Sequence, residues 1–326
     1  MRTEATSRPP SPRAKGRGPP WEAFGASWWL FWGRNAPREG SAPDLARRPV
    51  RRDARGYPPR RLGVPVDRTA VLSLFDSEMR QDPYADPGYR IEKQGSIVRM
   101  IGPTEHCIVY SRLALSEAPR AVAEQAADFR ARRQPVEWKV YAHDVPKELP
   151  DLLAGAGFLP KPRETLMVFD LSSRLPAPPL SVDIEIRQVR TPAGLDDLET
   201  VELAAFDRTE PTSRHLVGGR LSDPDLGVFV AYRAGAPVAG GRVDRVPGRS
   251  FAGLWGGGTV PEFRGRGIYR ALVAARADFA RARGARFLMV EALVDTSRPI
   301  LERIGFQPLS DVVGWELVPP EGDPPG

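Results

Sequence analysis

One stretch constrains the fold more than any other: residues 251 to 273 predict a strand, a glycine-containing turn and a helix in direct succession. Phe251 to Val260 is rich in apolar and aromatic residues, and Pro261, which has no backbone N–H, marks the end of the strand. A helical pattern opens at Ile268, with apolar residues at three- and four-residue spacing, and Gly284 stands where a helix-ending glycine is expected. The chain must therefore join a strand to a helix through a glycine-containing turn.

That turn, Arg264-Gly265-Arg266-Gly267, has the composition of an anion-binding site. The first amides of a helix have no internal partner, and the helix dipole places partial positive charge beside them. Glycine lacks a β-carbon, so a phosphate can approach the backbone closely. We expect a pyrophosphate ligand, with a plain tight turn as the alternative. The sequence lacks Gly-x-x-x-x-Gly-Lys-Ser/Thr, and Arg270 interrupts Gly-x-Gly-x-x-Gly, which argues against a P-loop and a dinucleotide fold.

These residues resemble the acetyl-CoA signature of the GNAT superfamily of N-acetyltransferases, Gln/Arg-x-x-Gly-x-Gly/Ala. Arg264 and Gly267 match it, and Tyr269 replaces the last Gly or Ala. The strand FLMVEA and the helix and turn SRPILERIGF follow as in the family, and the resemblance covers residues 183 to 318. It implies that acetyl-CoA, as acyl-donor substrate, is bound by the amides of Gly265 to Arg270, with its pantetheine arm along Gly258 to Val260. The residues implied are Gly258, Thr259, Val260, Arg264, Gly265, Arg266, Gly267, Ile268, Tyr269 and Arg270.

The resemblance also implies direct attack of a neutral amine on the acetyl carbonyl in a ternary complex, which requires a proton acceptor and a proton donor. The chain departs from the family at two positions. Leu301 stands where the family often has the Tyr that acts as general acid, and Val294 stands where it often has an Asn. Glu291 is the best side-chain candidate for the base, with Asp244 behind it; a buried structural Glu291 is the alternative. Tyr269 is the candidate acid, with core packing as its alternative.

The first half of the chain repeats the element order of the second. LLAGAGF (152 to 158) resembles ILERIGF (300 to 306), and a proline-rich segment, 172 to 182, separates the halves. The first half's equivalent of the cofactor turn, SRLALSEAPRAV (111 to 122), contains no glycine, so we expect no CoA there. The fold class predicted is α+β with a mixed sheet, in two tandem GNAT-like domains of which the first is degenerate. This layout resembles that of the mycothiol synthases.

The domain boundaries expected are 1–62 for a disordered Arg/Pro-rich tail, 65–175 for the degenerate domain and 183–318 for the acetyl-CoA-binding domain. The tail has 14 Lys/Arg against 5 Asp/Glu, whereas the whole chain has a net charge of +6, so the body is slightly acidic. The basic charge that would favour nucleic-acid binding therefore lies in the tail, which argues against nucleic-acid binding by the folded part. An apolar run within residues 21–33 is too short to span a bilayer. This run could instead contact a membrane surface or a partner, or it could be an upstream stretch translated from a start codon placed too early.

The single cysteine, Cys107, excludes an internal disulfide and fits the reducing cytoplasm; its apolar surroundings favour a buried structural thiol. His106, His143 and His215 have no metal-ligand spacing, so no metal is expected. His143 and Asp144 are adjacent at a strand end, where successive side chains point apart. We therefore interpret them as part of a turn rather than as an acid/base pair.

The resemblance implies that the acceptor is a primary amine of a small molecule or a peptide and that two predicted helices, 195–206 and 213–221, cover its site. These helices carry acidic residues that would attract a cationic amine. A solvated helix face is the alternative. The function predicted is N-acetyltransferase; the alternative is a catalytically inactive GNAT-fold protein that senses acyl-CoA or a metabolite. A third hypothesis makes the basic tail an anchor to a membrane or nucleic acid. The body is expected to be a monomer or homodimer. The acidic residues concerned are Asp196, Asp197, Glu199, Glu202, Asp207 and Glu210.

Overall fold

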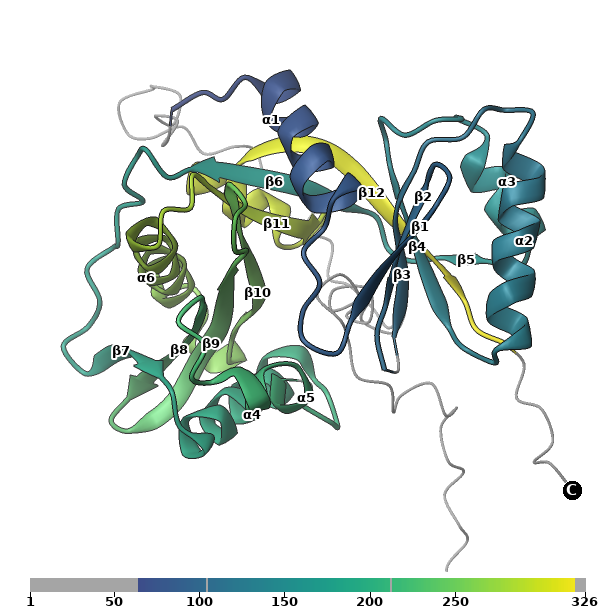
Figure 1. The fold of residues 1–326 in the computed structure, drawn as a ribbon. Helices are drawn as coiled ribbons and strands as arrows, with labels where there is room; N and C mark the ends of the chain where they lie inside the picture. The colour runs from purple at the N-terminus through teal and green to yellow at the C-terminus, as the bar shows by residue number, and fades with distance from the viewer. Residues whose placement is uncertain (1–63, 104, 212, 320–326) are drawn as a thin grey trace, which may run out of the picture.

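A computed structural model describes residues 64–319 except positions 104 and 212. The predictions for residues 1–62, including the apolar run within 21–33, lie outside the described residues. One twelve-stranded sheet runs through both halves in the order β1-β2-β3-β4-β12-β6-β11-β10-β9-β8-β7, and β5 pairs with β12 (Figure 1). No helix within the described residues is long and apolar enough to cross a membrane.

The first half opens with α1 (Arg68–Phe75), whose N-terminus is capped by the Asp67 carboxylate. A π-helical turn, Asp76–Gln81, continues it, so the predicted helix is present with a change of pitch near its end. The expected strands and helices follow, together with two short strands that the sequence did not predict, β1 and β5. The elements are β1 (Arg90–Gln94), β2 (Ile97–Ile101), β3 (His106–Ser111), α2 (Ala118–Ala131), β4 (Val136–Tyr141), α3 (Leu149–Gly155), β5 (Leu159–Pro160) and β6 (Glu164–Asp170).

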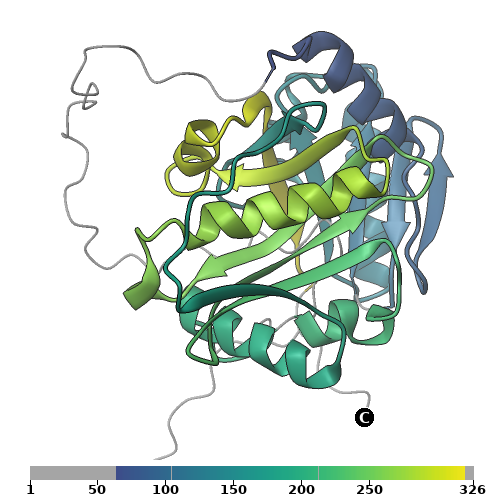
Figure 2. The same cartoon turned by 90° about the vertical axis from the view of Figure 1, so that its left-hand side faces the viewer.

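The second half has the predicted order of elements. Gly240 approaches Leu198 of α4, whereas the adjacent Gly241 approaches Arg276 of α6. Because successive strand residues face opposite sides, α4 and α6 cover opposite faces of the sheet; Figure 2 shows α6 lying across its strands. The elements are β7 (Ile184–Val189), α4 (Pro192–Phe206), α5 (Ser213–Val217), β8 (Leu226–Arg233), β9 (Ala236–Arg245), β10 (Phe251–Thr259), α6 (Ile268–Ala282), β11 (Phe287–Leu293), α7 (Arg298–Arg303) and β12 (Gln307–Leu317).

The last strand of each half lies in the other half's part of the sheet. β6, from the first half, pairs antiparallel with β11 over seven residue pairs, and β12, from the second, pairs with β4. β6 and β12 also pair with each other, so these two strands join the halves (Figure 1). The largest cluster of buried apolar side chains accordingly includes Phe75 and Tyr141 from one half and Phe251 and Met289 from the other. Each half therefore needs a strand from the other half to complete its part of the sheet.

The sheet opens between β10 and β11. These parallel strands pair at only three positions, Phe251↔Phe287, Ala252↔Leu288 and Gly253↔Met289. Beyond Gly253, β10 follows β9 through a bulge between Trp255 and Gly258, where Gly256 has a φ of +57°. The unpaired end of β10 leads through a 3₁₀ turn, Pro261–Phe263, to the start of α6. The opening and the glycine-containing turn therefore lie at the same end of β10.

Candidate active site

The turn before α6 has the backbone that the sequence predicted. Gly265 and Gly267 have φ values of +75° and +79°, in the left-handed region where a side chain is strained. A β-carbon built on Gly265 meets no atom within 4 Å, so the space beside it is open. One built on Gly267 would lie 3.2 Å from Cγ of Pro178, so the segment between the halves passes close to the turn.

Six consecutive amides at this turn have no hydrogen-bond acceptor in the part of the chain that the structure describes. Ala271 is the first residue of the helix start whose amide donates to a backbone carbonyl, that of Gly267, at 3.0 Å. Among the described residues, no hydrogen-bond acceptor is found for the amides of Gly265 to Arg270, and no side chain caps the helix. Amides at a helix start point toward a common region outside it, where the dipole is positive. The geometry suits a phosphate or pyrophosphate group.

The two arginines of the turn are placed differently. Arg264 folds back, donating from Nε to the carbonyl of Thr259 at 3.1 Å and from Nη2 to that of Ala205 at 2.9 Å. It thereby ties the end of α4 to the end of β10. Arg266 lies over the ring of Phe263, 5.3 Å from its centroid. Among the described residues, both guanidinium groups donate to backbone carbonyls rather than to carboxylates, so both add positive charge to the turn.

The strand end beside the turn is covered closely by α4. A β-carbon on Gly258 would lie 2.8 Å from Cβ of Ala205 and 2.9 Å from Cζ of Phe206, so only glycine allows this contact. The amide of Val260 donates to the carbonyl of Val238 at 3.0 Å. It is therefore engaged in the sheet.

Tyr269 lies one residue into α6, partly buried under the β10 bulge. Its ring atom Cε2 lies 3.2 Å from where a β-carbon on Gly257 would stand. Burial raises the pKa of Tyr269, and the neighbouring Arg276 opposes this rise. Arg276 is buried and donates to the carbonyls of Leu272 and Arg242, both at 3.2 Å; burial lowers its pKa to about 10. The phenol is therefore protonated at neutral pH, as a proton donor must be.

Glu291, on β11, is buried at the junction of the two halves. One carboxylate oxygen accepts from Nζ of Lys139 at 2.8 Å and the other from the hydroxyl of Tyr141 at 2.5 Å. Lys139 also lies 3.3 Å from Glu137 and 3.9 Å from Glu164, so three carboxylates surround it. Burial raises the pKa of Glu164 to about 8. The sequence did not indicate these partners, because β4 lies far from β11 along the chain.

Asp244, on β9, belongs to a second charged group on the α4 side of the sheet. It accepts from Nε of Arg242 at 3.1 Å and lies 3.3 Å from Arg220. Arg220 in turn lies 3.4 Å from Asp86 of the first half. Burial raises the pKa of Asp244 and raises that of Asp86 to about 7. Among the described residues, no group of three or more His, Cys, Asp or Glu is arranged to hold a metal ion.

The sequence suggested that acidic residues of α4 attract an amine. In the structure, most of their hydrogen bonds join α4 to α5. Glu202 accepts from the amide of Ser213 at 3.1 Å and from its hydroxyl at 2.5 Å. Glu199 accepts from the amide and the guanidinium of Arg214, at 3.1 and 2.8 Å. Asp197 accepts from a tyrosine hydroxyl of β8 at 2.7 Å. These carboxylates hold α5 and β8 against α4, which sets the shape of this face.

Residues 194–306, which contain this turn and its flanking strands, match the family model described as the acetyltransferase (GNAT) family. Over these residues the chain is similar to the acetyltransferase (GNAT) family. No curated protein matches the sequence.

Solved structures extend the likeness to both halves at the level of fold. A GCN5-related N-acetyltransferase from Kribbella flavida superposes with a TM-score of 0.59 at 16% identity, covering 78% of this chain and 95% of its own. One from Sphaerobacter thermophilus gives 0.55 at 19%, covering 81% and 96%. A tandem GNAT protein from the clavulanic acid biosynthesis pathway gives 0.52 at 14%, covering 74% and 86%. The fold is therefore a tandem GNAT arrangement, as the repeated element order predicted.

Proposed function

We propose that this chain is an N-acetyltransferase that transfers an acetyl group from acetyl-CoA to a primary amine of a small molecule or a peptide. The GNAT family supports the transferase chemistry. The observation that carries the proposal is the run of unpaired amides from Gly265 to Arg270 beside the opening between β10 and β11. That combination offers a pyrophosphate site and a place for an extended chain leading to it.

In this proposal the pyrophosphate of acetyl-CoA lies on the amides of Gly265 to Arg270, with charge from Arg264 and Arg266. The pantetheine arm runs along Gly258 to Val260, where the strand is free of β11. The residues present fit the donor, because the space beside Gly265 is open and, within residues 64–319 as described, these amides have no acceptor. These are the positions expected from the signature in the sequence.

The reaction forms a C–N bond and breaks the C–S bond of the thioester in one ternary complex. The departing thiolate takes a proton from Tyr269, whose pKa is raised by burial. The ammonium proton goes to Glu291, and Asp244 is the second candidate for this base. Nζ of Lys139 donates to Glu291 at 2.8 Å, so a positive charge lies directly beside the proposed base.

We further propose that the second domain, residues 183–318, binds one acetyl-CoA and that the first, residues 65–175, binds none. Glu117 precedes α2 in the first domain where glycine precedes α6, and a carboxylate at a helix start opposes a phosphate. The chain would act in the cytoplasm, which the lone Cys107 fits, as a monomer or homodimer.

Calorimetry of acetyl-CoA with the full chain tests the proposal. We expect one site per chain at micromolar affinity, about −8 kcal/mol. Gly267→Glu should abolish binding without unfolding the chain, because its charge would stand against the phosphates. Release of free thiol in the presence of a library of amines then tests turnover. No binding of acetyl-CoA by the wild-type chain would reject both the transferase and any CoA-dependent alternative.

The second candidate is a catalytically inactive GNAT-fold protein that senses acyl-CoA or a metabolite. The small space beside the proposed base favours it: the cavity next to Glu291 and Trp255 has a volume of only about 10 Å³, too little for an amine substrate. Leu301 and Val294, in place of the family's usual Tyr and Asn, point the same way. Tight binding of acetyl-CoA without thiol release from any amine would favour the sensor.

A further inference from the structure

A groove of about 450 Å³ lies where α1, β6, β12 and the end of β4 meet. Its volume is within the range of small-molecule sites, about 300–1,000 Å³. None of its lining residues is among those proposed to hold acetyl-CoA, so it is a separate feature of the surface. The polar side chains that line it are Arg68, His143, Thr165, Arg298, Ser310 and Asp311.

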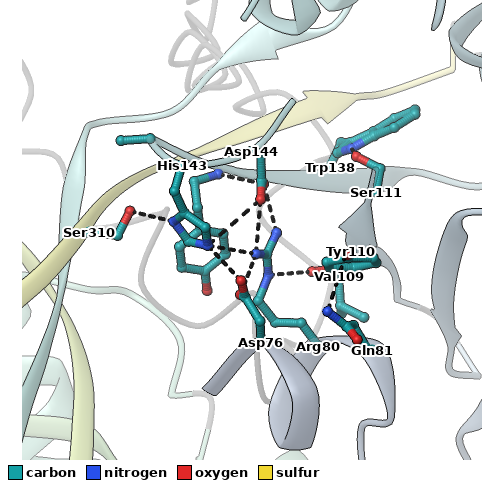
Figure 3. Close-up of polar contacts among 12 residues, drawn as sticks. Asp76, Arg80, Gln81, Val109, Tyr110, Ser111, Trp138, His143, Asp144 and Ser310 are labelled. Carbon is teal, nitrogen blue, oxygen red and sulfur yellow. Dashed lines mark hydrogen bonds and ion pairs between the residues drawn. The ribbon is translucent and has the colours of Figure 1, made fainter. Parts of the chain in front are cut away.

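A chain of hydrogen bonds runs from this groove into the protein. Oγ of Ser310 lies 3.0 Å from Nδ1 of His143, and Nε2 of His143 lies 2.8 Å from Oδ2 of Asp76 (Figure 3). The three residues come from β12, from the segment after β4 and from the π-helical turn. The pairing of β12 with β6 shifts between Pro308 and Ser310, and such a bulge redirects the side chains beside it.

Asp76 is held as a carboxylate by its surroundings. Nη1 of Arg80 lies 2.7 Å from Asp76, and Arg80 is itself fixed by two hydrogen bonds to Asp144, at 3.0 and 2.7 Å (Figure 3). Burial opposes ionisation of Asp76, but the hydrogen bond from His143 and the charge of Arg80 hold its pKa below the usual range. Asp144 therefore binds Arg80. It lies 3.9 Å from Nε2 of His143, too far for a hydrogen bond between these adjacent residues.

The ionised carboxylate fixes the tautomer of the histidine. A carboxylate only accepts hydrogen bonds, so Nε2 of His143 must carry the proton that bonds to Asp76. In the neutral imidazole Nδ1 is then an acceptor. The hydroxyl of Ser310 lies 3.0 Å from it and 3.1 Å from the carbonyl of Asp311, so rotation of the hydroxyl directs its proton to either acceptor. A hydroxyl, an imidazole base and an orienting carboxylate in this order are the parts of an activated serine nucleophile.

We propose that the groove is a second active site, in which Ser310 is the nucleophile for hydrolysis of small esters. Ser310 Oγ forms a bond to the ester carbonyl carbon as its proton passes to Nδ1 of His143. The alcohol leaves with that proton. Water, deprotonated by His143, then attacks the acyl-serine, and the carboxylic acid departs as Ser310 regains its proton. Asp76 acts as a positioning residue for the imidazole.

Arg68 gives the site a preference for anionic esters. Its Nη2 makes a long contact, 3.4 Å, to the carbonyl of Leu309, and among the described residues no carboxylate is paired with it. Arg298 also lines the groove, but it is paired with Glu302 at 2.9 Å and lies 3.6 Å from Asp311, so its charge is already compensated. A negative charge on the acid part of the substrate would therefore be placed beside the Arg68 guanidinium.

Covalent labelling of the wild-type full chain tests the nucleophile directly. A fluorophosphonate probe should bond to Ser310 Oγ with loss of fluoride, and peptide mass spectrometry should locate the adduct there. This measurement needs no variant, so the absence of an adduct on Ser310 of the folded chain would refute the proposal.

Hydrolysis of 4-nitrophenyl esters tests the base and the substrate class. Ser310→Ala and His143→Gln should lower the rate by about 100-fold or more. The matched control is Ser111→Ala, since this buried serine accepts from Trp138 outside the groove and its loss should leave the rate unchanged. The wild type should prefer 4-nitrophenyl hemisuccinate to the acetate, and Arg68→Gln should remove that preference. Equal rates in the wild type and Ser310→Ala, or no preference for the anion, would overturn the assignment.

Discussion

Two glycines at opposite ends of α6 provide a matched test of the proposed acetyl-CoA site. Gly265 precedes the helix with a φ of +75°, and Gly284 follows it with a φ of +78°. A β-carbon at either position meets no atom within 4 Å. Gly265→Ala and Gly284→Ala therefore introduce the same strain, about 1–2 kcal/mol, without a steric clash in the protein. Only the first lies beside the unpaired amides.

The expected effect on binding can be worked out from those amides. A methyl group at position 265 would stand where the phosphates approach the backbone, and we expect it to cost one amide–phosphate hydrogen bond. A hydrogen bond to a charged group contributes about 1.5–3 kcal/mol. At 1.4 kcal/mol per factor of ten, Gly265→Ala should weaken acetyl-CoA binding roughly 10- to 150-fold. Gly284→Ala should leave the affinity unchanged.

Urea unfolding and calorimetry separate the two effects. Both variants should lose a similar free energy of unfolding, which confirms that the folded backbone is strained equally at the two positions. Their dissociation constants for acetyl-CoA should then differ by the factor above. If Gly265→Ala bound acetyl-CoA as tightly as Gly284→Ala, with equal losses of stability, the assignment of the phosphates to this turn would be incorrect.

Three other predictions concern the buried charges. Lys139→Met should lower the free energy of unfolding by about 3–5 kcal/mol in urea, because it leaves Glu291 buried without its cation, and adding Glu291→Met should restore most of the loss. Glu291→Gln should lower kcat by about 100-fold or more while the acetyl-CoA dissociation constant stays unchanged; an unaltered kcat would assign Glu291 a purely structural role. Asp86 has a pKa of about 7 when folded and an ordinary value of 3.8, so the unfolded chain releases this proton first and stability falls as pH rises through that interval. Asp86→Asn should therefore gain stability relative to the wild type, by at most about 3 kcal/mol, between about pH 5 and about pH 7 in thermal unfolding; a constant difference would contradict the raised pKa.

Local patterns predicted most elements of this fold correctly. The strand at 251–260 and the helix that opens at Ile268 are present within a residue of the expected bounds, because apolar periodicity, Pro261 and Gly284 all favour the same local structure. β1, Arg90–Gln94, was missed because it is a charged, largely exposed strand with no apolar alternation. β5 has only two residues, too few to form a pattern.

The partners of the buried charges could not be predicted. Glu291 was identified from its place after the turn, but its ion pair with Lys139 joins residues 152 positions apart. Likewise Ser310 and Asp76 drew no attention in the sequence, because a serine in a strand and an aspartate in a helix are ordinary. His143 was interpreted correctly as part of a turn, yet its bonds to both residues depend on where β12 lies.

The sequence by itself determined the chemistry of the turn. Two glycines and two arginines before a helix give left-handed backbone, open amides and positive charge whatever surrounds them, because these properties belong to the local chain. Only the tertiary structure decided how the halves combine. The exchange of β6 and β12 depends on which strand edges meet, and that is settled by burial across the whole sheet rather than by any local pattern. The groove with Ser310 and the cluster around Glu291 exist because of that exchange, since each takes side chains from both halves.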